Sequence, residues 1–149
     1  MMMKHLFLIL VLGFLSTFQV QAQKSEVFLV DGKALRGYDP VAFFTKEEAV
    51  KGVDSLTWTW KEAVWYFSSP ENKALFMAQP EKYAPQYGGY CAYGMSEGHK
   101  APTEIDTWTL HEGKLYFNYN KEVKSLWVKD KEGHIKKADA NWPDLKNKE

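Results

Sequence analysis

Residues 56–67 read LTWTWKEAVWYF and carry the clearest secondary-structure signal in the chain. In the first half of this stretch, apolar side chains occupy every second position with threonines between them, which is typical of a strand that buries one face. Lys61 and Glu62 are suited to turn the chain into a second strand over residues 63–67. The stretch therefore predicts an antiparallel hairpin.

A helix start follows this hairpin directly. Ser68 and Ser69 can accept hydrogen bonds from the first helical N–H groups, and Pro70 fits the first turn of a helix. We expect the helix to run to about Ala78. A second, shorter helical turn is expected at residues 80–83, where another proline begins the sequence PEKY.

Two weaker signals precede the hairpin. Residues 26–30 alternate loosely and are followed by Asp-Gly, so a short strand and a tight turn are expected there. Thr45 and Glu48 have the spacing of a capping box, which predicts a short helix that ends at Gly52.

The C-terminal part of the chain predicts a second hairpin and further helices. Residues 107–110 and 114–119 flank the turn sequence His-Glu-Gly. Asn120 can cap a helix, Gly133 is expected to end it, and a short helix is expected near residues 135–140. The elements together predict an α+β fold: a small single domain in which two antiparallel β-hairpins carry several short helices.

The N-terminal residues resemble a secretory signal peptide. A short basic start precedes an apolar run from Leu6 to Leu15, which is too short to span a bilayer as a helix. Small side chains before Gln23 predict cleavage after Ala22, so the signal is residues 1–22 and the domain is residues 23–149. The alternative is an N-terminal membrane anchor. We expect an exported protein, periplasmic or extracellular, with no stable membrane insertion once the signal is removed.

The composition limits both the partners and the source of stability. Nineteen basic and 19 acidic side chains balance, so there is no electrostatic signature of a nucleic-acid partner. Cys91 is the only cysteine, and one thiol cannot form an internal disulfide. Stability must therefore come from packing, for which the chain has six tryptophans, eight tyrosines and nine phenylalanines.

Two sequence stretches resemble the YHS domain family. The first is Tyr38-Asp39-Pro40-Val41. The second is AVWYFSSPEN at residues 63–72, which continues through Phe76 to the PEKY sequence at residues 80–83. The resemblance covers residues 37–83, and the tail from residue 87 to residue 142 looks like an extension found in a subgroup of small exported YHS-like proteins. It implies a fold related to treble-clef metal-binding domains.

The resemblance also implies where a metal site would lie. Members of the family commonly have one cysteine just after Asp-Pro-Val and two more, with three residues between them, where the strand meets the helix. This chain has Ala42, Ser68 and Asn72 at those positions. A hydroxyl and an amide are poor ligands for a soft cation, so the resemblance implies the fold more strongly than the metal site.

A different metal site is one hypothesis for the function. Cys91, Met95 and His99 follow one another at intervals of four, so a continuous helix would place all three on one face. Thiolate, thioether and imidazole together suit copper, and zinc is the other candidate. The alternative is that Cys91 and Met95 are core residues and His99 lies in a loop. His111 and His134 are isolated in sequence, and neither has the spacing of a zinc site.

The second hypothesis is a metal-free module that binds a small ligand or a protein partner. Its candidate ligand-binding residues are Tyr38 and Asp39, at a turn, and Tyr87, Gly88, Gly89 and Tyr90, in the glycine-aromatic loop at residues 87–95. Glycines permit close approach of a ligand to the backbone. The Tyr38-Asp39-Pro40 turn has a structural explanation as well, because an Asp side chain accepts backbone N–H bonds there. The chain has no local catalytic signature, so we do not expect an enzyme.

Overall fold

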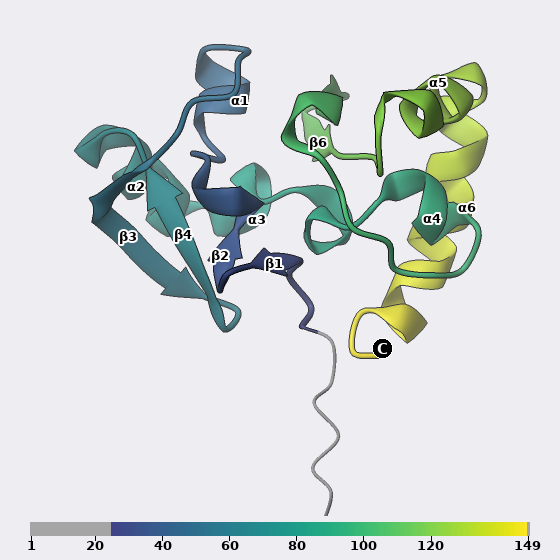
Figure 1. Cartoon of the computed structure of the whole chain (residues 1–149), viewed down its shortest axis with the longest axis horizontal. Coiled ribbons are helices and arrows are strands. Elements are labelled where there is room, and N and C mark those ends of the chain that lie inside the picture. Colours follow the sequence, from purple (N-terminus) through teal and green to yellow (C-terminus); the bar gives the residue numbers. More distant parts are fainter. Residues whose placement is uncertain (1–24, 149) are drawn as a thin grey trace, which may run out of the picture.

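The structure is a computed structural model in which residues 25–148 are described, and the predicted signal peptide lies outside them. The described chain forms two halves that lie side by side (Figure 1). The first half contains a sheet with short helices, and the second contains a small hairpin with the C-terminal helices. The predicted α+β fold with its two antiparallel hairpins is confirmed.

Within residues 25–148, the sheet of the first half has four strands in the order β1-β2-β4-β3. Their bounds are β1 Leu29–Val30, β2 Lys33–Ala34, β3 Val53–Trp60 and β4 Ala63–Phe67. Strands β3 and β4 form the predicted hairpin, with Trp58 opposite Trp65. Strand β2 pairs with β4 in parallel, through Lys33 and Val64.

Helix α2, Pro70–Ala78, packs on this sheet through Phe76. Ser69 accepts a hydrogen bond from the Asn72 N–H, so the predicted cap and helix are confirmed. Phe76 is fully buried and its ring lies 4.9 Å from that of Trp65. The predicted helical turn is also present as α3, Pro80–Tyr83. Aromatic packing therefore holds the first half together.

The second half begins with a 3₁₀ turn at Gln86–Gly89 and helix α4 at Ala92–Ser96. It continues through a 3₁₀ turn at Ile105–Thr107, strands β5 (Thr109–His111) and β6 (Lys114–Tyr116), and helices α5 (Lys121–Lys129) and α6 (Lys131–Leu145). Side chains of β6 alternate between two cores. Leu115 packs into the core of the first half, whereas Tyr116 packs with Trp127 in the core of the second. The hairpin therefore joins the two halves.

The helix predicted from Thr45 to Gly52 is wrong. Helix α1 occupies Ala42–Thr45 instead, and Thr45 is its last residue. The carboxylate of Asp39 accepts hydrogen bonds from the N–H groups of Val41 and Ala42. A buried aspartate thus starts the helix earlier than the exposed capping-box pattern predicts.

The predicted end of a helix at Gly133 is also wrong. Helix α5 ends at Lys129, and α6 runs through both Gly133 and Pro143. Asp130 caps α6 by accepting the N–H of Gly133 at 3.2 Å. A Cβ at Gly133 would overlap the Asp130 carboxylate, so this glycine permits the cap and does not break the helix.

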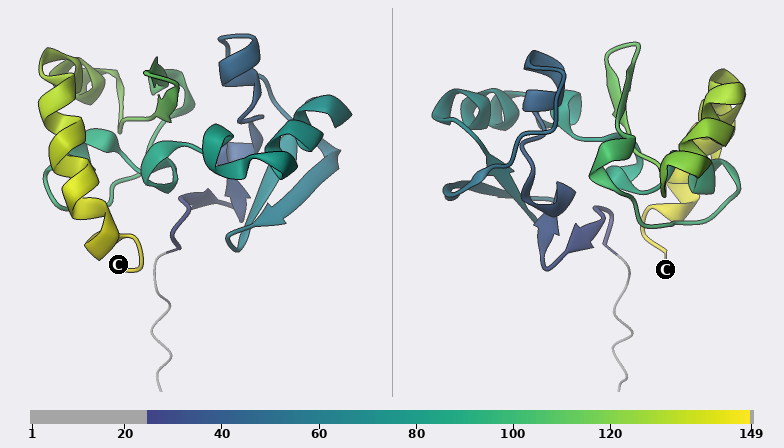
Figure 2. Two further views of the ribbon diagram at one scale, coloured as in Figure 1. Left: turned by 180° about the vertical axis from the view of Figure 1, so that it is seen from behind. Right: turned by 45° about the horizontal axis from the view of Figure 1, so that its top comes forward.

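The two ends of the described chain meet at the side chain of Lys100. Its ammonium donates to the carbonyl oxygens of Ser25, Lys146 and Lys148, and it lies 5.0 Å from the ring centre of Tyr90. The views in Figure 2 place the first described strand and the end of α6 near each other. Among the described residues, no helix has both the length and the apolar character needed to cross a membrane.

Candidate functional site

A cleft of about 90 Å³ lies between the two halves of the domain. The first half contributes Glu26, Trp60, Lys61 and Glu81, among others. The second half contributes Tyr87, Gly88 and Trp142. The indole rings of Trp60, Trp65 and Trp142, a phenol ring, two carboxylates and an ammonium group therefore surround one small space.

The charged side chains of the cleft form a compact group. The Lys61 ammonium lies 2.9 Å from Glu26 Oε1, 3.4 Å from Glu81 Oε1 and 4.7 Å from the ring centre of Trp60. Burial would lower the pKa of Lys61, but the hydrogen bond and the charge of Glu26, with those of Glu81, outweigh burial and raise it. The cleft thus already binds one cation, and its two carboxylates leave it with an excess negative charge.

The loop residues Tyr87 and Gly88 form one wall of the cleft in an unusual backbone conformation. Both have positive φ, 57° and 62°. A Cβ at Gly88 would overlap the carbonyl oxygen of Glu26, and the Gly88 carbonyl accepts the N–H of Phe28 at 2.9 Å. The close approach that a glycine permits is therefore made here by the N-terminal segment of the chain itself.

The phenol of Tyr87 is locked in place behind the cleft. It donates to Asp139 Oδ1 at 2.8 Å, and its ring lies 6.0 Å from that of Trp142. Burial, the hydrogen bond to Asp139 and the charge of that carboxylate all raise the pKa of Tyr87. Helix α6, which carries both partners, thereby fixes the aromatic wall.

The other residues of the glycine-aromatic loop point elsewhere. Tyr90 is buried and its hydroxyl donates to the Ser25 carbonyl at 2.8 Å. Gly89 is buried and its carbonyl accepts the Thr103 hydroxyl at 2.7 Å. Of the four loop residues predicted to bind a ligand, Tyr87 and Gly88 lie at the cleft.

Asp39 lies in a buried hydrogen-bond network and not at the cleft. It is fully buried and accepts five hydrogen bonds from described residues. Two come from the backbone of Val41 and Ala42. The other three reach Oδ2, at 2.8 Å from the Ser68 N–H, 2.6 Å from its hydroxyl and 2.8 Å from the Asn72 amide. The predicted Asp turn is confirmed.

This network occupies the place at which the YHS resemblance implies metal ligands. Ala42, Ser68 and Asn72 stand at the implied cysteine positions, and all three donate to Asp39. A carboxylate surrounded by hydrogen-bond donors thus links the strand-to-helix turn to the Asp-Pro-Val turn. Tyr38, from the same turn, is half-buried and borders a separate, shallow surface depression together with Arg36 and Trp108.

Cys91 is buried at the start of α4, where its sulfur has a structural partner on each side. The sulfur accepts the N–H of Gly94 at 3.4 Å and that of Tyr119 at 3.2 Å, and it lies 3.6 Å from Asn118 Oδ1. Burial raises the pKa of the thiol above its ordinary value, against the smaller lowering effect of these N–H groups. The geometry favours a protonated thiol that caps the helix.

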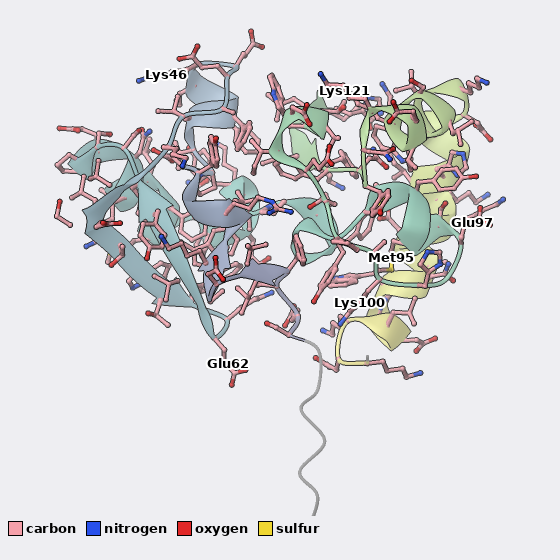
Figure 3. The ribbon with its side chains drawn as sticks, viewed as in Figure 1. Lys46, Glu62, Met95, Glu97, Lys100 and Lys121 are labelled. Atoms are coloured by element: carbon pink, nitrogen blue, oxygen red, sulfur yellow. The ribbon has the colours of Figure 1, made fainter. Side chains whose placement is uncertain are left out.

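The other two residues of the predicted metal site point in different directions. Met95 lies on α4 (Figure 3) and is fully buried in the core of the second half. His99 is exposed, and it follows α4, which ends at Ser96. The continuous helix needed to place Cys91, Met95 and His99 on one face is therefore not formed.

A cluster that the sequence did not predict brings two distant segments together. His111 and Glu112 at the tip of the β5–β6 hairpin meet Glu132 in the first turn of α6, with one potential ligand atom from each lying within 4.8 Å of the others. The side chain of His111, which is isolated in sequence, is only 18% exposed. His134 Nδ1 lies 3.0 Å from the Ser96 hydroxyl, outside this cluster.

Comparison with known proteins adds no further likeness. No protein-family model, no curated protein and no solved structure matches this chain. The resemblance to YHS domains therefore rests on the sequence stretches described above.

Proposed function

We propose that this chain is an exported, YHS-like binding domain whose cleft takes the small cationic head of an organic ligand. The observation that carries the proposal is the meeting of Trp60 and Trp142 with Glu26 and Glu81 around one space. Indole faces attract cations through the ring quadrupole, and carboxylates do so through their charge. The function is binding, without catalysis.

The position of Lys61 supports this ligand class. Its ammonium, between two carboxylates and over an indole ring, occupies the place that an organic cation would take. The side chain is about one-third exposed and lies at the turn of the β3–β4 hairpin, so it can swing into solvent. The size of the cleft suits an ammonium or methylammonium group with its substituents extending outward.

Copper or zinc binding by Cys91, Met95 and His99 has weaker support. The Cys91 sulfur is engaged with backbone N–H groups, and a raised thiol pKa disfavours the thiolate that a metal requires. Met95 and His99 do not converge on it. Ligand binding that makes no use of this cysteine site is therefore the better-supported function.

Titration with methylammonium and tetramethylammonium chloride tests the proposal, with sodium chloride added to hold ionic strength constant. Tryptophan fluorescence and the indole N–H resonances in NMR spectra report binding near Trp60 and Trp142. We expect Glu26→Gln to weaken binding by about fivefold, the equivalent of about 1 kcal/mol for one partly exposed cation–carboxylate contact. Lys61→Met should strengthen binding by a similar factor, because it vacates the cationic position.

The matched control is Glu62→Gln. Glu62 neighbours Lys61 at the tip of the hairpin, is exposed and does not line the cleft (Figure 3). This substitution changes the net charge by the same amount as Glu26→Gln and should leave affinity unchanged. The proposal fails if neither cation binds the wild type or Lys61→Met at millimolar concentration, or if the two glutamine variants weaken binding equally.

A further inference from the structure

The cluster at the tip of the β5–β6 hairpin combines one imidazole with two carboxylates. His111 and Glu112 are held by the hairpin, in which His111 pairs with Lys114 and Glu112 adopts a positive φ of 49°. Glu132 comes from the first turn of α6, 21 positions after His111. The contributing atoms belong to different elements, so the folded state brings them together.

The His111 imidazole has a buried nitrogen that lacks a hydrogen bond. Its Nε2 is shielded from solvent and, among the described residues, has no partner in hydrogen-bond geometry, although Glu132 Oε1 lies 2.6 Å away. A buried nitrogen in this state is costly unless a proton or another cation occupies the space between it and the carboxylate. The nitrogen therefore lies close to the Glu132 carboxylate without being hydrogen-bonded to it.

The electrostatic surroundings of the cluster are negative. The nearby phenol of Tyr116 lies in the same negative field. Burial, followed by the charges of Asp139, Glu112 and Glu132, raises the pKa of Tyr116 to about 12. Two of the three carboxylates that act on Tyr116 belong to the cluster. A cation placed between them gains from the same field.

We propose that His111, Glu112 and Glu132 bind one divalent zinc ion at the junction of the β5–β6 hairpin and α6. One imidazole nitrogen and two carboxylate oxygens form a borderline-to-hard ligand set, which suits Zn²⁺ and disfavours Cu⁺. Two ligands of a tetrahedral zinc ion lie about 3.4 Å apart. Glu132 must therefore move back slightly from His111, which its 70% exposed side chain allows. A water molecule completes the coordination.

The site is independent of the cation-binding cleft and of the cysteine. Its three ligands are not among the residues that line the cleft, so a negative result for one proposal does not bear on the other. Zinc bound here would link the hairpin to α6 and stabilise the second half of the domain. It would also place the metal at oxygen and nitrogen ligands instead of the thiolates that the family resemblance implies.

Isothermal titration calorimetry with ZnCl₂ on the protein without a histidine tag tests the proposal. We expect one zinc ion per chain, and a weakening of at least about tenfold in both His111→Ala and Glu132→Gln. His99→Ala is the matched control, because His99 is an exposed histidine outside the cluster and belongs to the alternative site with Cys91. It should bind zinc as the wild type does.

Cobalt(II) absorption provides a second measurement that identifies the ligands. A site of nitrogen and oxygen ligands gives visible d–d bands without the near-ultraviolet charge-transfer band of a thiolate. Glu132→Gln alters an exposed side chain, so loss of binding in a variant with an unchanged thermal midpoint cannot come from misfolding. Absence of zinc binding at micromolar metal, equal affinity in all three variants, or a thiolate band would each overturn the proposal.

Discussion

Replacing Asp39 with alanine tests the reasoning about the buried network. Asp39→Ala removes the common acceptor of five hydrogen bonds. Ser68 is half-buried, so water can reach its donors, and the Asn72 amide also donates to the Ser68 hydroxyl at 3.5 Å. The N–H groups of Val41 and Ala42, in contrast, lie in fully buried residues. Two buried donors left unpaired cost about 2 kcal/mol each, so we expect the free energy of unfolding to fall by about 4 kcal/mol.

Urea unfolding followed by tryptophan fluorescence measures this loss. For a domain of this size, it corresponds to a decrease of roughly 15 °C in the thermal midpoint. Asn72→Ala should cost about 1.5 kcal/mol, and the double variant should cost less than the sum because both changes act on one hydrogen bond. Asp54→Ala, an exposed aspartate in β3, is the control. A loss below about 1 kcal/mol in Asp39→Ala would refute the role assigned to the network.

Two further predictions follow from the raised pKa values. The folded state holds the phenol protons of Tyr87 and Tyr116 more tightly than the unfolded chain does. The contribution of these two groups to the free energy of unfolding is therefore fully present below pH 10, the ordinary pKa of tyrosine, and it is lost as the pH rises beyond 10. Urea midpoints on both sides of pH 10 should show this decline, and Tyr87→Phe should reduce it; a decline equally steep in that variant would contradict the explanation. At neutral pH, Cys91 should react with iodoacetamide at least about a hundredfold more slowly in the folded protein than in urea, because the thiol is buried and protonated. Equal alkylation rates in the two states would show that the sulfur is accessible.

Local chemistry accounts for the elements that the sequence predicted correctly. The alternation from Leu56 to Trp60 and the Ser69-Pro70 helix start depend on neighbouring residues, so the β3–β4 hairpin and α2 are visible without tertiary information. The Thr45 capping box failed because Asp39 makes stronger, buried hydrogen bonds to the same region. The prediction that a helix ends at Gly133 was wrong for a related reason, because the missing side chain of this glycine makes room for the Asp130 cap.

The candidate sites were less predictable, because they depend on residues that are distant in sequence. Tyr87 and Gly88 were identified from their composition, but nothing local indicates that Glu26 and Trp142 would meet them. The spacing of Cys91 and His99 suggested a site that needed a longer helix than Gly94 and Gly98 support. Conversely, His111 and Glu132 have no motif spacing, and only the packing of the hairpin against α6 brings them together.

The hydrogen bonds of the Lys100 ammonium determine on which side of the domain a tether or fusion partner would lie. By binding the carbonyls of Ser25, Lys146 and Lys148, it makes the first and last described residues leave the domain beside each other (Figure 1). A tether or fusion partner at either terminus would therefore hold the domain from the same side. In both arrangements, α1 and α5 would face outward, and the presented surface would be the same.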